Sequence, residues 1–395
     1  MRDDGLSSVD RRALTSVAAQ FFVNGLIFAS FVPRLPEIRD RIDIGNDALG
    51  RLLAIGAMSG LLGSLVVGTL VERFGTRRLL VVAGLLLCSS LSIVGIATVP
   101  AVLVLGLASL SIFDVLVDSS MNLQASWISG RRRAPVMNRL HGLWSLGTVI
   151  GGVAAAQLAA LGVPLNVHLF AVSAILVVVV LFVGTGLLRE DEAPTSHADD
   201  DVAGETGSTK QRPRTGSRPL LLFVIVGGCS IAMEMTSSDW AAIRLADDFG
   251  ATAGIAGLAY VAFTVGMTTG RFGGDSMIVR FGHQRVADVG IAMTAAGLIV
   301  ASFAPVVALV MAGYLLAGLG VATQFPKLYD DAAKYPGRRG AGLGALTGGS
   351  RIALLITPIL VGTLAASRLS VGAATAAVTL PAALAFFVFT RPRRG

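Results

Sequence analysis

Long apolar segments alternate with short polar segments along almost the whole chain. Each apolar segment has about the 20 residues that an α-helix needs to cross the hydrocarbon core of a bilayer. The segments form two groups of six: 13–33, 48–71, 79–98, 100–124, 139–161 and 165–188, then 219–241, 253–275, 286–304, 306–326, 340–364 and 370–390. The pattern predicts an all-α membrane protein with twelve transmembrane helices.

A polar segment of mixed charge, residues 189–218, separates the two groups. It contains no aromatic residue, and its composition is typical of a flexible linker. We therefore expect an N-terminal six-helix half over residues 1–188, a linker, and a C-terminal six-helix half over residues 219–395.

An internal repeat supports this division. The tripeptide Arg-Phe-Gly at 73–75 returns at 280–282, which is an offset of 207 residues. The same offset relates Gly63 to Gly270 and brings the first predicted helix onto the seventh. Transporters built from parallel repeats have two such halves, with the substrate site between them near the middle of the membrane.

Composition and charge point to the same class of protein. Of the 395 residues, 53% are hydrophobic and only 14% are charged, whereas soluble domains contain about 25% charged residues. The net charge of +7 does not indicate a nucleic-acid partner, because the basic residues form short clusters between apolar segments. Assigning the N-terminus to the inside places 25 of the 32 Lys and Arg residues in inner segments. Both termini and the linker are therefore predicted to be cytoplasmic.

Several kinds of chemistry find no support in the sequence. Cys88 and Cys229 both lie within apolar segments, so we expect neither a disulfide nor a metal site. HExxH, GxSxG and GxxxxGK[ST] motifs are absent from the sequence, which argues against an enzyme and against ATP-driven transport by this chain alone. No cofactor is predicted.

The fourth predicted helix carries two acids inside the membrane. Asp114, Asp118 and Asn122 are spaced four residues apart, so they share one helical face that must point into the bundle. An ionised Asp in mid-membrane costs about 2.5–3.5 kcal/mol on insertion scales. Two carboxylates one turn apart do not both ionise easily, so we expect at least one to hold a proton near neutral pH. This favours proton coupling; the alternative is a polar network that only holds helices together.

Other polar residues lie in or near the predicted helices. Glu234 lies well inside the seventh helix as a further substrate or proton candidate, and Asp239-Trp240 lies near its outer end, where a Trp is expected at the membrane interface. Arg351 stands alone in the eleventh helix and needs a partner, for which these carboxylates are the candidates. The remaining candidates, which could equally be packing residues, are Asn24, His141, Trp144 and Gln324.

A motif follows the second predicted helix, where residues 68–78 read GTLVERFGTRR. Glycine allows close helix approach or a tight turn, and an acid beside basic residues can form a latch between two conformations. The residues concerned are Gly68, Glu72, Arg73, Gly75, Arg77 and Arg78. The spacing resembles the signature of the major facilitator superfamily; the alternative is an ordinary basic loop. The motif returns in the C-terminal half at the offset of 207 residues, but there Val279 replaces the acid. The N-terminal latch is therefore expected to be the stronger one.

The resemblance extends to a branch of that superfamily. Residues 118–122, 140–148, 234–240 and 260–271 resemble fucose-permease-like carriers and uncharacterised bacterial inner-membrane members of the YbjJ type. In that branch the acid of the fourth helix, here Asp118, takes part in proton coupling. The first helix departs from the fucose permease, because it holds Asn24 where a second acid would stand.

Together these features predict a monomeric secondary transporter in a bacterial inner membrane, whose partners are lipid, a small solute and protons. Uptake of a sugar or a related polar metabolite is the first hypothesis. The alternative is a proton-antiport exporter of drugs or metabolites. Such exporters usually carry Gly-Pro-x-x-Gly-Gly in the fifth helix, whereas residues 147–152 contain no proline. A passive facilitator stays open as well.

Overall fold

The structure is a computed structural model. It describes residues 7–132, 136–193, 217–324, 328, 331–332, 335 and 341–390. Within these residues all regular structure is helical. Residues 194–216 of the predicted linker lie outside the described part of the chain.

The first group of helices covers the N-terminal half. Its members are α1 (Ser8–Phe31), the 3₁₀ turn η1 (Val32–Arg34), α2 (Leu35–Arg41), α3 (Asn46–Phe74), α4 (Thr76–Gly95), α5 (Pro100–Arg132), α6 (Met137–Ala160), α7 (Leu165–Gly186) and η2 (Glu190–Glu192). The second group consists of α8 (Ser217–Asp239), α9 (Ala241–Phe249), α10 (Ala253–Phe281), α11 (His283–Phe303), α12 (Val307–Val321), α14 (Ala341–Ala365) and α15 (Val371–Thr390).

These helices confirm the predicted fold class. Eleven of the described helices are long and apolar enough to cross a membrane, and α12 is a shorter apolar helix at the tenth predicted position. Most boundaries agree with the prediction within a few residues. The sequence did not predict α2 and α9, the short helices that follow the first and the seventh span.

The internal repeat is visible in the backbone. An offset of 207 residues carries α3 onto α10, since both begin and end at equivalent positions. Gly75 and Gly282, which follow these two helices, have φ angles of +76° and +83°, a region that favours glycine. Gly75 therefore makes the tight turn that the motif predicts.

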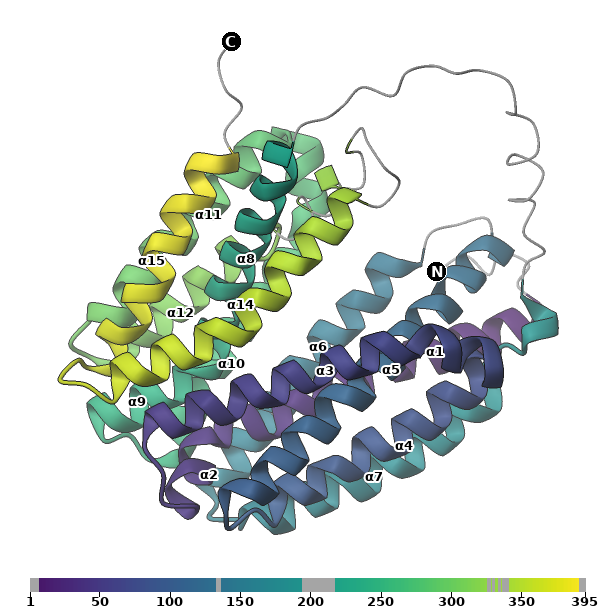
Figure 1. The fold of residues 1–395 in the computed structure, drawn as a ribbon, viewed down its shortest axis with the longest axis horizontal. Helices are drawn as coiled ribbons and strands as arrows, with labels where there is room; N and C mark the ends of the chain where they lie inside the picture. Colours follow the sequence, from purple (N-terminus) through teal and green to yellow (C-terminus); the bar gives the residue numbers. More distant parts are fainter. Residues whose placement is uncertain are drawn as a thin grey trace.

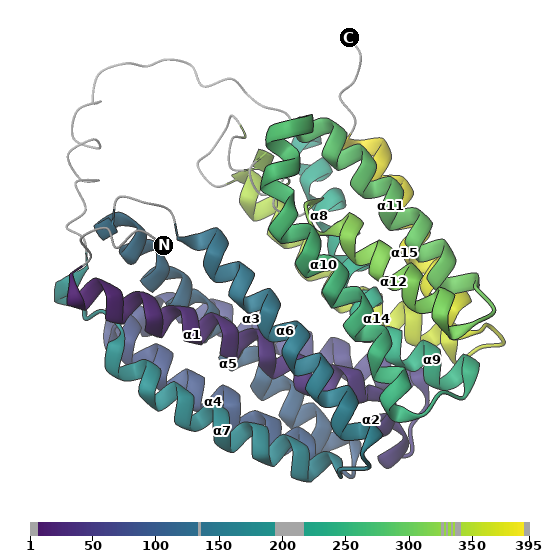
Figure 2. The same cartoon turned by 180° about the vertical axis from the view of Figure 1, so that it is seen from behind.

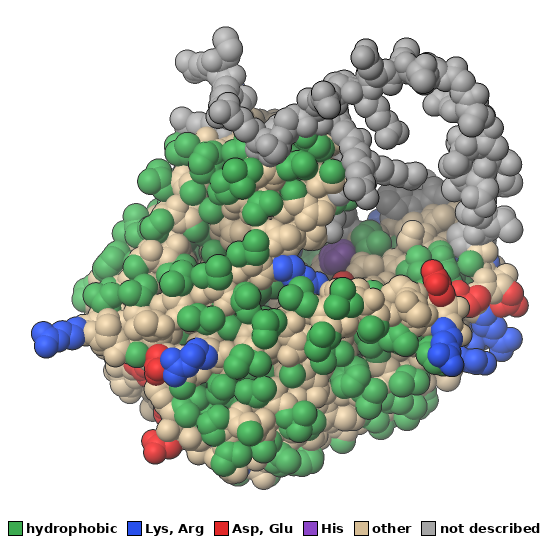
Figure 3. Space-filling model, in the orientation of Figure 1, with side chains coloured by type: hydrophobic (Ala, Val, Ile, Leu, Met, Phe, Trp, Pro, Cys, Tyr) green, Lys and Arg blue, Asp and Glu red, His purple; other side chains and the backbone are tan. Residues whose placement is uncertain are grey.

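The outer surface is that of a membrane protein. Large apolar side chains cover the sides of both bundles in Figure 3, while the charged groups visible in this view gather mainly near the helix ends. Exposed examples include Leu65, Leu161, Phe182 and Val279, with exposed fractions of 70–88%. Such a surface is stable only against lipid chains.

The two halves meet at one end and diverge toward the other (Figures 1 and 2). Across the junction α3 packs on α14 and α6 packs on α10, and the short helices α2 and α9 also touch. The end where the halves diverge is the one where α1 begins, α8 begins and α15 ends. Figure 3 shows a hollow between the bundles on this side.

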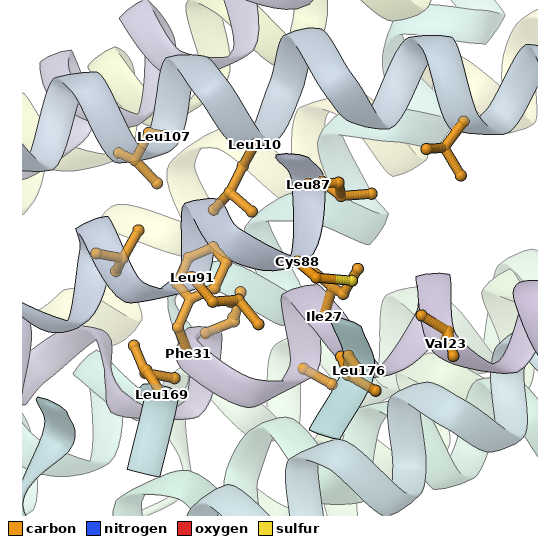
Figure 4. Close-up of a cluster of buried hydrophobic side chains, with 14 of the residues drawn as sticks. Val23, Ile27, Phe31, Leu87, Cys88, Leu91, Leu107, Leu110, Leu169 and Leu176 are labelled. Carbon is orange, nitrogen blue, oxygen red and sulfur yellow. The ribbon is translucent and has the colours of Figure 1, made fainter. Parts of the chain in front are cut away.

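Each half has its own apolar core, and one core extends across the junction. In the N-terminal half Ile27, Leu87, Cys88 and Leu176 pack between α1, α4 and α7 (Figure 4). The same cluster continues into Trp240 of the C-terminal half, which is only 1% exposed. The indole of Trp240 therefore fills the joint core at the closed end and does not face lipid.

Glycine allows the closest helix contacts within each half. A Cβ on Gly349 of α14 would lie 1.9 Å from the carbonyl oxygen of Val224 in α8, whereas a Cβ on the neighbouring Gly348 would meet no atom within 4 Å. Small residues at such crossings let the backbones of membrane helices touch.

We predict that Gly349→Ala lowers the melting temperature of the purified protein, because α8 and α14 must separate to admit the methyl group. Overpacking of this kind costs about 1–3 kcal/mol. Gly348→Ala is the matched control and should leave the melting temperature unchanged. Equal melting temperatures for the two variants in detergent would contradict this account of the α8–α14 contact.

Candidate functional site

The two acids of α5 lie one turn apart in different surroundings. Asn24 Nδ2 of α1 donates a hydrogen bond of 3.1 Å to Asp114 Oδ1, and Asn24 is only 3% exposed. Asn122 Nδ2 donates one of 3.0 Å to Asp118 Oδ1. Asp118 is exposed, while Asp114 is half-buried. Asp114 is thus held by a second helix. Asp118 has its described hydrogen-bond partner within its own helix and keeps an open side.

A cation from the other half lies near this pair. Arg351, on α14, reaches this region across the junction: a Cβ on Gly60 of α3 would lie 3.6 Å from Arg351 Nη1 and 3.3 Å from the carbonyl oxygen of Ser111 in α5. Its Nη2 lies 3.4 Å from Ser64 Oγ of α3, and Arg351 forms no ion pair with any described residue. Arg351 therefore faces the acids across the junction without being fixed to either.

A second polar cluster joins the halves between α6, α8 and α10. Arg271 Nη2 donates a hydrogen bond of 3.3 Å to Glu234 Oε1, and its Nη1 donates one of 3.2 Å to Ser145 Oγ of α6. The guanidinium carbon lies 5.5 Å from the ring centroid of Trp144, which is a cation–π distance. Among the described residues, contacts engage one Glu234 oxygen and two Arg271 nitrogens, so both charges retain hydrogen-bonding capacity toward a solute.

His141 lies on α6 one turn before Trp144. Its ring is exposed and meets the edge of Phe21 at a centroid distance of 5.1 Å. The charge of Arg271 also acts on it. His141 therefore stands near the second cluster on the exposed side of α6.

Close packing of α1 on α6 brings these groups together. A Cβ on Gly25 would lie 2.0 Å from the carbonyl oxygen of Trp144, and one on Gly147 would lie 2.3 Å from that of Phe22. With the two backbones in contact, Asn24 of α1 and Trp144 of α6 are held at the same level of the bundle. The glycine run at 147–152 thus serves helix packing.

The structure also places one candidate away from the junction. Gln324 is 1% exposed, and its Nε2 donates to Thr294 Oγ1 of α11 over 3.1 Å. Its amide is therefore part of the α11–α12 contact and does not face the space between the halves. This placement favours the alternative that Gln324 is a packing residue.

Arg271 is the main residue that the sequence analysis missed. The charge count assigned it to an inner loop, but α10 continues to Phe281 and Arg271 lies inside the helix, facing Glu234. The signal was present, because Arg271 falls within the predicted span 253–275. A lone arginine inside a span should have been treated like Arg351.

The latch motif adopts an open arrangement. Glu72 is exposed and forms no ion pair with any described residue, and a Cβ on Gly68 would meet nothing within 4 Å. The close helix approach expected at Gly68 is absent, because the halves diverge at this end. Arg77 Nε donates to the carbonyl oxygen of Gly184 over 2.9 Å. Arg73 lies over the ring of its neighbour Phe74 at 5.3 Å, and Arg78 is exposed.

An acid from the predicted linker occupies the N-terminus of α4. Glu190 Oε1 accepts hydrogen bonds from Thr76 N and Thr76 Oγ1 over 2.5 and 2.9 Å. Gln124 of α5 then joins Thr76 to the carbonyl oxygen of Leu188. Residues 189–193 are therefore packed on the N-terminal half, and a flexible linker can begin only beyond them.

Comparisons with known proteins agree with this architecture. A sequence model of the major facilitator superfamily matches residues 17–240 and 222–395. An uncharacterised MFS-type transporter of Yersinia pestis is 26% identical over 325 residues, which covers 80% of this chain and 79% of that protein. The membrane protein MosC of Rhizobium meliloti is 28% identical over 323 residues, covering 81% and 75%.

A solved structure shares the fold. The crystal structure of the nucleoside transporter NupG superposes with a TM-score of 0.74 at 11% identity and covers 98% of this chain and all of that one. These matches make the chain a membrane transporter of small solutes and not an enzyme. Its two repeated bundles, its polar residues between them and the family match together show that the chain belongs to the major facilitator superfamily.

Proposed function

We propose that this transporter couples the uptake of a small polar solute, such as a sugar, to the proton gradient by alternating access. The observation that carries the proposal is the pair Asp114 and Asp118 on one face of α5, with Arg351 of the opposite half reaching the space beside α5. Ionisable residues inside a membrane bundle mark ion and proton pathways. Asp118, with its open side, is the proton carrier, and Asp114 with Asn24 supports it.

Protonation can act on the junction through Arg351. An ionised Asp118 attracts the guanidinium and draws α14 toward α5, whereas a neutral Asp118 releases it. Repulsion between the two carboxylates disappears when one of them takes a proton. The proton thus changes the relative energy of the two conformations, which is what coupling requires.

The solute would bind at the second cluster. Trp144 offers a flat apolar face, and Glu234 and Arg271 offer an acceptor beside a donor, a pairing that suits hydroxyl groups. Because Trp144 and Ser145 belong to one half and Glu234 and Arg271 to the other, a solute here touches both. Its binding would then favour closure of the halves around it. Antiport export would use the same acids with the opposite direction of solute flow.

We propose that the termini and the linker face the cytoplasm of a bacterial cell, in whose inner membrane the protein lies. A reporter fused after Asp200 is then expected to read cytoplasmic, because most basic residues lie on that side. A fusion after Leu161, in the exposed turn between α6 and α7, should read periplasmic. The reverse pattern would overturn the orientation, and with it the assignment of the open end.

Asp118→Asn should abolish concentrative uptake while leaving exchange of solute intact. The substitution preserves size and hydrogen bonding but removes the titratable group. Uptake against a gradient and counterflow in proteoliposomes measure the two activities separately. Asp43→Asn, at an exposed turn residue, is the control and should accumulate solute normally. Normal accumulation by Asp118→Asn would remove Asp118 from the coupling mechanism.

The motif at 68–78 is proposed to close the open end in the other conformation. Charge-assisted hydrogen bonds from Glu72 are each worth about 1.5–3 kcal/mol at best and less where exposed. Glu72→Gln should therefore shift the population toward the state seen here and slow net transport, while solute affinity within one state changes little.

Labelling of single cysteines on both sides of the cavity measures this shift. The second repeat supplies the comparison, because Val279 replaces the acid and is 88% exposed. Substitution of Arg280 should consequently alter labelling less than substitution of Arg73. Equal sensitivity of the two arginines, or an unchanged pattern in Glu72→Gln, would show that the latch is not asymmetric.

A further inference from the structure

The closed end of the junction carries an ion pair between the halves. Arg39 of α2 donates from Nη1 to Asp247 Oδ2 of α9 over 2.6 Å. Asn46, the first residue of α3, donates from Nδ2 to the same oxygen over 2.9 Å and accepts from Arg39 Nη1 over 2.7 Å. The three side chains form a closed triangle in which Asp247 is the only member from the C-terminal half.

Arg39 has a second acidic partner within its own half. Its Nη2 and Nε lie 2.7 and 2.8 Å from Asp40 Oδ1. Asp40 and Asp247 are separated by 207 residues, so they occupy equivalent positions in the two repeats. The residue equivalent to Arg39 is Ala246. The Arg39 guanidinium therefore pairs with two aspartates at equivalent positions of the repeats, Asp40 in its own half and Asp247 in the other.

The surroundings make this contact more than a surface ion pair. The side chain of Arg39 is 12% exposed and that of Asp247 is 23% exposed, so water screens the pair only in part. Asp247 lies in the last turn of α9, where the helix dipole disfavours a negative charge, and beside the first residue of α3, where the dipole favours one. Asp247 thus gains electrostatically from contact with the other half.

We propose that the closed end is a gate and that Arg39 is its switch residue. Arg39 pairs with two aspartates in one conformation and with one aspartate in the other. In the closed gate Arg39 bridges Asp40 and Asp247. When the gate opens, Arg39 stays with Asp40 and gives up only Asp247 and its link to α9. Opening then leaves no arginine unpaired, which keeps the two conformations close in energy. This inference rests on the alternating access proposed above, but not on proton coupling or on the solute.

The test is cysteine accessibility in the purified full-length protein, in detergent and without solute. The reporter is Val361→Cys in a Cys229→Ser background. Val361 is 0% exposed, packs in the core shared by both halves, and precedes Gly362, where a Cβ would lie 2.4 Å from the Asn46 carbonyl oxygen. Cys88 is also 0% exposed, so the background without the reporter measures residual labelling.

Arg39→Gln and Asp247→Asn should each speed maleimide labelling of the reporter by about two- to fivefold, as expected for a partly exposed ion pair. The double variant should label no faster than the faster single variant, because both remove the same contact. Asp40→Asn should not speed labelling, since it removes the partner that Arg39 keeps in the open gate. Asp47→Asn breaks the Arg51–Asp47 pair of 2.8 Å within α3 at the same end and should have no effect.

Two results would overturn the proposal. One is unchanged labelling in both Arg39→Gln and Asp247→Asn. The other is acceleration by Asp40→Asn equal to that by Asp247→Asn, which would indicate general loosening of this end. Melting temperatures of all variants identify any that are misfolded. Failure here would leave proton coupling untouched, because that is tested by accumulation in Asp118→Asn.

Discussion

A charged or strongly polar side chain within a bilayer must find a partner inside the protein or a water-filled space. In this transporter that constraint is met mainly at the junction of two apolar bundles. Asn24 meets Asp114, Arg271 meets Glu234 and Ser145, and Arg351 faces the acids of α5 from the opposite half. Two of these contacts, Asn24 with Asp114 and Arg271 with Glu234, lie within one half. Arg271 also reaches Ser145 of the other half, and Arg351 lies opposite α5, so the second bundle completes the polar region.

The two halves are in contact at one end of the junction and separated at the other, so the molecule has a closed end and an open end. At the closed end Trp240 fills a core shared by both halves, and Arg39 links Asp40 to Asp247. At the open end a Cβ on Gly68 would meet no described atom within 4 Å, and Glu72 has no ion pair among the described residues. The acids and the second cluster lie on helices that run between these ends. A carrier that alternates would exchange the roles of the two ends while keeping this central region.

Much of the fold was predictable because its signals are local and repeated. Twelve apolar segments of membrane length and a 207-residue repeat fix the helices and the relation between α3 and α10. The short helices α2 and α9 escaped prediction because they are too brief and too polar to stand out from loops. Gly75 was predictable as a turn, since its position in the motif demands it, and its φ angle of +76° agrees.

The candidate site was only partly predictable, because a single sequence gives the face of a helix but not the partner across it. The spacing of Asp114 and Asp118 placed them correctly on one face of α5. Arg271 was missed because a basic residue near a helix end resembles a loop residue until its contact with Glu234 is seen. The burial of Trp240 and Gln324 was not predictable for the same reason, since tertiary packing decides whether such side chains face lipid, solute or core.

Proton-coupled uptake requires that solute and proton cross the membrane together, and the proton flux that accompanies solute entry measures this. Solutes that stabilise the protein in a thermal-shift screen of sugars, nucleosides and common drugs would be added to energy-depleted cells that express it. Proton-coupled uptake predicts that the lightly buffered medium becomes more alkaline as solute enters, and that the change is absent with Asp118→Asn. Acidification of the medium would indicate antiport. Solute entry with no pH change would show a passive facilitator and contradict the account.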